Sequence, residues 1–205
     1  MKEIKRGLKA LLLAVLAYLT QACVMGYLAV DGVTGSVMFA VLAILTVSYG
    51  KKYAFCASCL IGMLTECMLS GVNALYLIAY PVITMLCAQA FADMSDRKRE
   101  RRRNRIVSRL QDGKKRKLSP HREGDLPAHL RVVLCAGLMD LILNIALCAY
   151  MYLIGVEITF THVRRAAAAV AYTAAIAFVL MVPLRAFLGM YPRRRRQTDK
   201  GGELL

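Results

Sequence analysis

Lysine and arginine fill every second gap between the apolar stretches of this chain, and this alternation constrains the fold more than any other feature. The basic gaps are, in order, the amino terminus, the Lys51-Lys52 pair, the run from Arg97 to Arg122 and the tail that begins at Arg193. The gaps between them carry Asp31, then Ser70-Gly71, then Glu157 before the edge residues Arg164 and Arg165. Basic residues stay on the cytoplasmic side of a membrane during insertion. The alternation therefore predicts an even number of crossings with both termini in the cytoplasm.

Composition supports a membrane protein over a soluble domain. Hydrophobic residues make up 58% of the 205 residues, and they lie in long uncharged runs beside blocks of arginine. The net charge of +15 also suggests a nucleic-acid partner, because phosphates attract such residues. Nearly all of the excess charge lies at predicted cytoplasmic edges, where topogenic charge and contact with anionic lipids explain it more simply. We therefore expect no nucleic acid among the partners.

The apolar stretches predict an all-α bundle of six transmembrane helices, since about 20 apolar residues cross roughly 30 Å of hydrocarbon. The expected spans are Leu8–Val30, Val33–Tyr49, Tyr53–Leu69, Ala74–Ala92, His129–Ile154 and Val163–Met190. The first resembles a secretory signal, but its apolar run is too long for one and favours a retained span. The second is short and begins with Thr34, Gly35 and Ser36. The third and fourth are so close in sequence that they must form an antiparallel hairpin.

The chain reads as one integral membrane domain over residues 1–205. A basic cytoplasmic insertion covers 95–126, and a cytoplasmic tail covers 191–205. Two interpretations of the insertion remain open. It is either a solvated surface that touches anionic lipid, or a docking site for a cytoplasmic partner.

Motifs for catalysis or metal binding are lacking. All seven cysteines fall inside apolar stretches, where cysteine behaves as a small hydrophobe. The Cys56-Ala-Ser-Cys59 spacing suits a redox or metal half-site, but no second pair or histidine cluster accompanies it. We therefore predict a protein with no catalytic residue, no metal and no cofactor.

Polar residues inside the expected spans are the candidate site, because each one is unfavourable in hydrocarbon without a partner. We expect a polar seam formed by Gln21, Glu66, Asn73, Asp140, Asn144 and Arg185. Gln21 and Glu66 lie at comparable depth, so a hydrogen bond between them is plausible. Arg185 either pairs with Asp140 or extends to the membrane surface. Three roles stay open for the seam: holding helices together, recognising a partner, or conducting ions.

The stretch from Gly62 to Tyr80 resembles the central signature of the bacterial rod shape-determining protein MreD family. In that family a glycine and an acidic residue one turn apart precede a Ser-Gly turn and an Asn/His-Ala-Leu-x-Tyr run. Here these are Gly62, Glu66, Ser70-Gly71 and a run that begins with Asn73-Ala74-Leu75, has Tyr76 directly after Leu75 and ends at Tyr80. Val182-Pro183-Leu184-Arg185 is similar to the closing element of the family.

The resemblance implies a non-enzymatic component of the cell-elongation machinery in the bacterial plasma membrane. Its implied partners are an MreC-like bitopic protein, and beyond it the MreB filament and the RodA/class B penicillin-binding protein synthase. The fold of the family is similar to substrate-binding subunits of vitamin uptake transporters, which gives the alternative function. Such a subunit would contact a coupling protein through small residues such as Ala10 and Ala14.

Overall fold

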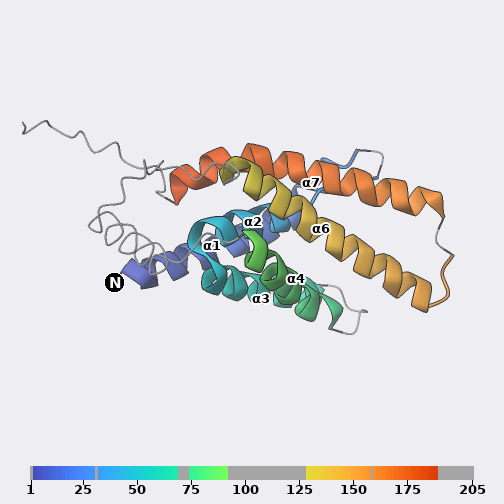
Figure 1. Cartoon of the computed structure of the whole chain (residues 1–205), viewed down its shortest axis with the longest axis horizontal. Coiled ribbons are helices and arrows are strands. Elements are labelled where there is room, and N and C mark those ends of the chain that lie inside the picture. Colours follow the sequence, from blue (N-terminus) through green and yellow to red (C-terminus); the bar gives the residue numbers. More distant parts are fainter. Residues whose placement is uncertain (1, 31, 69–73, 92–127, 158, 189–205) are drawn as a thin grey trace, which may run out of the picture.

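The computed structural model describes residues 2–30, 32–68, 74–91, 128–157 and 159–188, which form six helices and no strand (Figure 1). The helices are α1 (Lys2–Cys23), α2 (Val37–Tyr49), α3 (Lys51–Met68), α4 (Leu75–Phe91), α6 (Ala128–Leu153) and α7 (Phe160–Phe187). The predicted all-α class is confirmed. The expected insertion at 95–126 and the tail at 191–205 lie outside the described residues.

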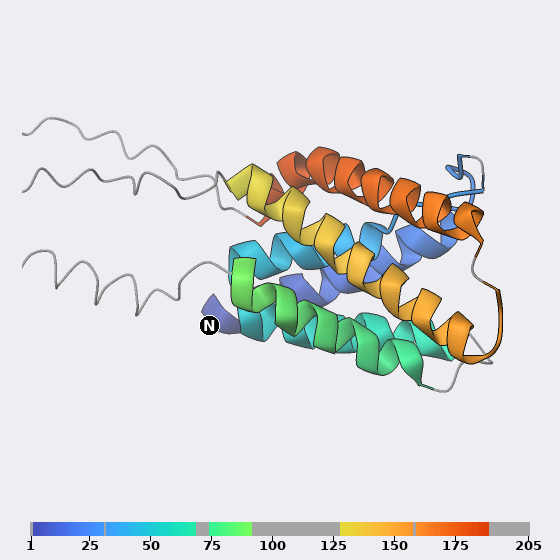
Figure 2. The same ribbon diagram turned by 45° about the vertical axis from the view of Figure 1, so that its right-hand side comes forward.

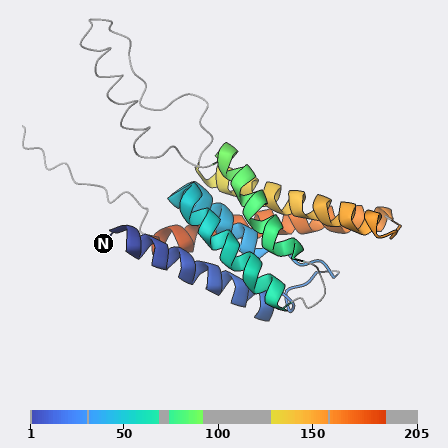
Figure 3. The ribbon, with the colours of Figure 1, turned by 90° about the horizontal axis from the view of Figure 1, so that it is seen from below.

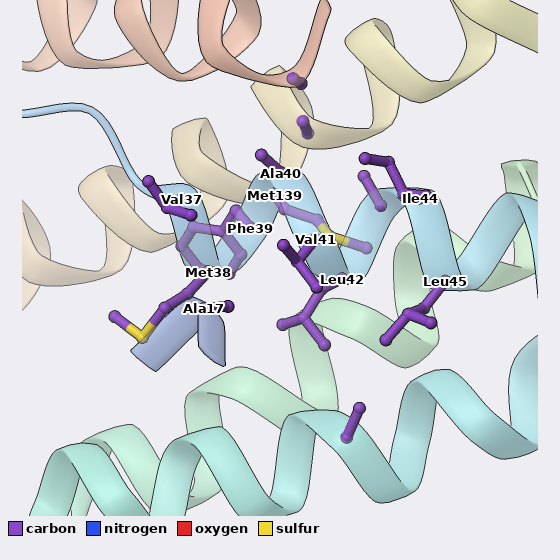
Figure 4. Close-up of a cluster of buried hydrophobic side chains, with 14 of the residues drawn as sticks. Ala17, Val37, Met38, Phe39, Ala40, Val41, Leu42, Ile44, Leu45 and Met139 are labelled. Carbon is purple, nitrogen blue, oxygen red and sulfur yellow. The ribbon is translucent and has the colours of Figure 1, made fainter. Parts of the chain in front are cut away.

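The short helix α2 forms the centre of the molecule. It has 13 residues, and all from Val37 to Val47 are buried. It contacts each of the other five helices. Figure 4 shows its side chains, among them Phe39, Leu42 and Leu45, packed between the neighbouring helices. A helix that is apolar on every side is stable only when it is surrounded in this way, so its sequence suits its place.

The other helices form a ring around α2. Contacts run from α1 to α3, from α3 to α4, from α4 to α6 and from α6 to α7. Between α7 and α1 the ring is bridged by Lys9, whose Nζ donates a hydrogen bond to the Phe187 carbonyl at 3.3 Å. The same Nζ lies 5.4 Å from the centre of the Phe187 ring. A cation at the carboxyl end of a helix also interacts favourably with its dipole.

Consecutive helices alternate in direction, so basic segments gather at one end. Figure 2 shows the amino terminus, the α2–α3 junction, the end of α4, the start of α6 and the end of α7 at the same end of the bundle. The Lys51-Lys52 pair lies there, together with Arg6 and Lys9 of α1. The connection between α6 and α7 lies at the opposite end.

Three boundaries expected from sequence differ from the helices by more than three residues. The first helix begins at Lys2 instead of Leu8 and ends at Cys23 instead of Val30, and the second begins at Val37 instead of Val33. The intervening segment forms turns and an isolated antiparallel bridge between Val30 and Val33. Hydropathy extends α1 too far because these residues are apolar without being helical. The other four helices begin and end within three residues of the expected spans.

Among the described residues, three helices contain segments that are long and apolar enough to cross a membrane. These segments are Arg6–Cys23 of α1, His129–Leu153 of α6 and Phe160–Leu184 of α7. The helices α2 and α4 are apolar but shorter, at 13 and 17 residues. The third expected span, α3, has 18 residues and carries Lys51, Lys52 and Glu66.

The expected hairpin of the third and fourth spans is present as α3 and α4, and their backbones meet closely at Gly62. A Cβ atom on Gly62 would lie 2.9 Å from the Tyr76 carbonyl oxygen and 3.3 Å from the Leu77 Cα. Only a residue without a side chain fits against the α4 backbone at this distance. Small residues of this kind allow close helix contact.

Candidate functional site

Buried polar groups converge where α2 begins. The Ser36 N–H donates to Thr173 Oγ1 at 2.8 Å, and Thr173 Oγ1 donates to Asp140 Oδ2 at 2.9 Å. Asp140 is 5% exposed and Thr173 is fully buried. One hydroxyl thus joins the first residues of α2 to the middle of α6 and α7.

Gln21 of α1 also forms hydrogen bonds to the backbone at the start of α2. Its Oε1 accepts from the Val37 N–H at 2.8 Å, and its Nε2 donates to the Gly35 carbonyl at 3.3 Å. The first N–H groups of a helix have no partner within the helix. Gln21 and Thr173 therefore satisfy two successive N–H groups, those of Ser36 and Val37, that would otherwise be unpaired inside the bundle.

Helices α3 and α4 contribute Thr65 and Tyr80. Both hydroxyls lie 3.9 Å from the Met38 sulfur. The Tyr80 ring stacks on Phe39 with a centroid separation of 4.9 Å. These residues comprise one polar residue from each helix of the ring, together with Ser36 before α2. We call them the polar centre: Gln21, Ser36, Thr65, Tyr80, Asp140 and Thr173.

The start of α2 is fixed by Gly35 and Ser36. Ser36 is the N-cap residue, with an extended backbone, and its Oγ accepts from the Phe39 N–H at 3.3 Å. A Cβ atom on Gly35 would lie 2.7 Å from Ile176 Cδ1 and 3.2 Å from the Thr173 nitrogen. Glycine therefore lets the non-helical segment lie directly against α7 and directs Ser36 toward Thr173.

Glu66 belongs to a second polar site, at the turn of the α3–α4 hairpin. Its Oε1 accepts from the Ala74 N–H at 2.9 Å and its Oε2 accepts from the Tyr76 N–H at 3.2 Å. The carboxylate thus caps the amino terminus of α4 in an arrangement that favours negative charge. The expected bond between Gln21 and Glu66 is wrong, because each binds backbone groups in a different part of the bundle.

The remaining residues of the expected seam are placed as follows. Asn144 donates from Nδ2 to the Asp140 backbone carbonyl at 2.9 Å, so it bonds to its own helix. Asn73 and the Arg185 side chain lie outside the described part of the chain. The expected pairing of Arg185 with Asp140 therefore stays a prediction.

An open apolar hollow lies on the outer side of α3 and α4. It has a volume of about 240 Å³ and is lined by Phe55, Pro81, Val82, Met85, Leu86 and Gln89. Within the described residues, no three His, Cys, Asp or Glu side chains come together as metal ligands would. The seven cysteines are free thiols, two of which, Cys87 and Cys135, are buried between α4 and α6.

Comparison with protein-family models, with characterised proteins and with solved structures gives no match. The polar centre joins six segments of chain by hydrogen bonds, and the groups described here are bonded to other parts of the same chain. This arrangement fixes helix positions.

Four members of the polar centre were not expected from sequence: Ser36, Thr65, Tyr80 and Thr173. Hydroxyl residues are common in apolar helices and carry no distinctive spacing. Ser36 alone had a signal, since a Gly-Ser pair before an apolar run is typical of a helix start.

Proposed function

We propose that the protein is a multi-pass protein of the bacterial plasma membrane that crosses six times with both termini in the cytoplasm. The lengths and apolarity of α1, α6 and α7 support the membrane location. The gathering of Lys51, Lys52 and Arg6 at one end of the bundle supports the orientation. On this proposal α2 crosses only part of the bilayer, at about 20 Å, and the non-helical segment before it completes the crossing.

We further propose a non-enzymatic scaffold of the cell-elongation machinery that docks partner membrane proteins and so influences cell shape and peptidoglycan synthesis. One observation carries this proposal: Gln21, Glu66, Asp140 and Asn144 are all bonded to groups of this chain. An ion path or a catalytic site needs polar groups that can exchange partners with a substrate. Groups that hold helices in register suit a platform whose surface meets other proteins.

The residues that carry the family resemblance have definite places in the bundle. Gly62 permits the close approach of α3 and α4, and Glu66 caps α4. Tyr80 packs against α2 through Phe39. In this chain these residues set the geometry of one hairpin and place it against the central helix.

The partners proposed on this resemblance are an MreC-like bitopic protein and, through it, the MreB filament and the RodA/class B penicillin-binding protein synthase. Anionic lipids are proposed to contact the basic insertion at 95–126. The alternative, a vitamin-type uptake subunit, would need small residues on α1 to face a coupling protein. Ala10 and Ala14 are instead buried in the bundle, at 3% and 0% exposed.

Affinity purification from bacterial membranes in a mild detergent tests the proposal. The scaffold predicts recovery of a protein with one membrane span and an extracytoplasmic domain, together with rounded cells when the protein is depleted. Recovery of an ATPase-coupled module with a bound vitamin, and normal cell shape on depletion, would contradict the scaffold and favour the uptake subunit.

A further inference from the structure

The α6–α7 hairpin extends further than the rest of the bundle at the end away from the amino terminus (Figures 1 and 3). Its apolar segments have 25 residues each. At helical rise each segment measures about 37 Å. The hydrocarbon core is about 30 Å thick, and a typical tilt of about 20° shortens the span by only about 2 Å.

By contrast, the 18 residues of α3 measure about 27 Å and fit within the bilayer. If α3 and α6 start at the same membrane surface, the end of α6 and the start of α7 lie beyond the opposite surface. In the proposed orientation that is the extracytoplasmic side.

The end of this hairpin has a defined backbone. Gly155 has a φ of 88°, its N–H donates to the Tyr152 carbonyl, and the Val156 N–H donates to the Met151 carbonyl. These two bonds are the Schellman arrangement that ends a helix. On α7, His162 Nδ1 accepts from the Thr159 N–H at 3.2 Å. The end of α6 and the start of α7 are therefore both capped.

The surface around this connection is strongly apolar and exposed. Phe160 is 79% exposed and Leu153 is 82% exposed. We define the hairpin tip as the exposed apolar residues around the connection: Tyr152, Leu153, Ile154, Val156, Phe160 and Val163. Lipid tails cover such residues inside the bilayer, but beyond its surface an apolar patch of this kind is unfavourable in water and marks an interaction site.

Two arginines border the hairpin tip. Arg164 and Arg165 are exposed on α7 within two turns of its start. Cations near the amino-terminal end of a helix are unfavourable with respect to its dipole. Arginine on the extracytoplasmic side also opposes the usual distribution of basic residues. Both effects are offset when the arginines face carboxylates on another molecule.

We propose that the hairpin tip, with Arg164 and Arg165, is a docking surface for the extracytoplasmic segment of a partner membrane protein. The segment would present apolar side chains to the tip and acidic side chains to the two arginines. This inference rests on the proposed function and orientation, and it names the surface and the chemistry of the partner.

Cysteine accessibility tests where the tip lies. In a variant whose seven native cysteines are replaced, Ile154→Cys and Phe160→Cys should react with a membrane-impermeant thiol reagent added to intact cells. The controls are Ile145→Cys and Phe178→Cys, at positions 59% and 64% exposed in the middle of α6 and α7. These should remain unlabelled. Protection of positions 154 and 160 equal to that of the controls would place the tip in lipid and overturn the proposal.

Photo-crosslinking tests the occupant. A photoreactive phenylalanine analogue at position 160 should form an adduct with an extracytoplasmic peptide rich in acidic and apolar residues, whereas the analogue at position 178 should not. Reversing both charges, with Arg164→Glu and Arg165→Glu, should reduce the adduct by about tenfold or more, and Arg164→Lys should preserve most of it. Adducts with phospholipid alone would overturn the proposal.

The identity of the crosslinked peptide separates this inference from the proposed function. A peptide from a bitopic cell-elongation protein supports both. A charge-dependent adduct with a protein unrelated to cell elongation supports the docking surface and contradicts the scaffold.

Discussion

At the scale of the residue, the buried hydroxyl of Thr173 joins three segments of the chain. It accepts from the Ser36 N–H and donates to Asp140, so both of its hydrogen-bonding directions are used. Valine has nearly the same shape but neither function. Thr173→Val should therefore lower the free energy of unfolding by about 1–3 kcal/mol for each group left unsatisfied. Thermal or denaturant unfolding of the purified protein in detergent measures this loss.

Thr173→Ser is the matched control, because it keeps the hydroxyl and removes one methyl group. It should retain most of the stability that Thr173→Val loses. Equal losses in the two variants would show that the methyl group matters and the hydrogen bonds do not.

Glu66 allows a second test at this scale. Glu66→Ala removes both acceptors from the amino terminus of α4 and should lower the free energy of unfolding by about 0.5–2 kcal/mol, as loss of a helix cap does. Glu157→Ala removes an exposed carboxylate from the α6–α7 connection and should leave the stability unchanged. If both variants unfold alike, Glu66 is not a structural cap.

The sequence predicts which charged and amide residues matter, but not what they bind. Gln21, Glu66 and Asp140 stand out because such groups are unfavourable in an apolar helix. Their partners are mainly backbone N–H groups at the starts of α2 and α4. No periodicity in the sequence predicts which backbone N–H groups these side chains bind. The role of Thr173 cannot be predicted from the sequence either, because it arises only from the packing of α7 against the segment before α2.

At the scale of the element, Gly62 sets the separation of α3 and α4. Gly62→Ala would place a Cβ atom 2.9 Å from a backbone oxygen that cannot move independently of α4. The hairpin must open slightly, with an expected loss of about 1–3 kcal/mol, as in other overpacked sites. Gly26→Ala is the control, because nothing lies within 4 Å of its added Cβ. A larger loss for Gly26→Ala than for Gly62→Ala would contradict this packing.

The segment between α1 and α2 illustrates why hydropathy alone predicts the end of a helix wrongly. The apolar run of α1 continues past Cys23, so the sequence predicts one long helix there. In the structure Gln21 and Tyr172 bond to backbone groups of the following segment, at Val37, Gly35 and Leu28. These contacts join residues as many as 144 positions apart, and they hold the segment in a non-helical path. Such contacts between distant residues cannot be predicted from the local sequence.

At the scale of the whole molecule, one buried helix organises five others. The ring of α1, α3, α4, α6 and α7 buries α2, and the polar centre fixes where α2 starts. Opposite ends of the bundle then differ in chemistry, with Arg6, Lys9, Lys51 and Lys52 at one and the apolar hairpin tip, bordered by Arg164 and Arg165, at the other. This polarity matches the alternation of basic gaps in the sequence, on which the proposed six crossings depend.

The most direct test of the six crossings is the sidedness of the connections, measured on intact cells with a membrane-impermeant thiol reagent. Single cysteines replace Asp31, Ser70, Glu157, Lys52 or Lys115 in a variant without native cysteines. Six crossings with both termini in the cytoplasm predict labelling at positions 31, 70 and 157, and protection at 52 and 115 until the membrane is permeabilised. Labelling of position 115 in intact cells, with position 31, 70 or 157 protected, would contradict it.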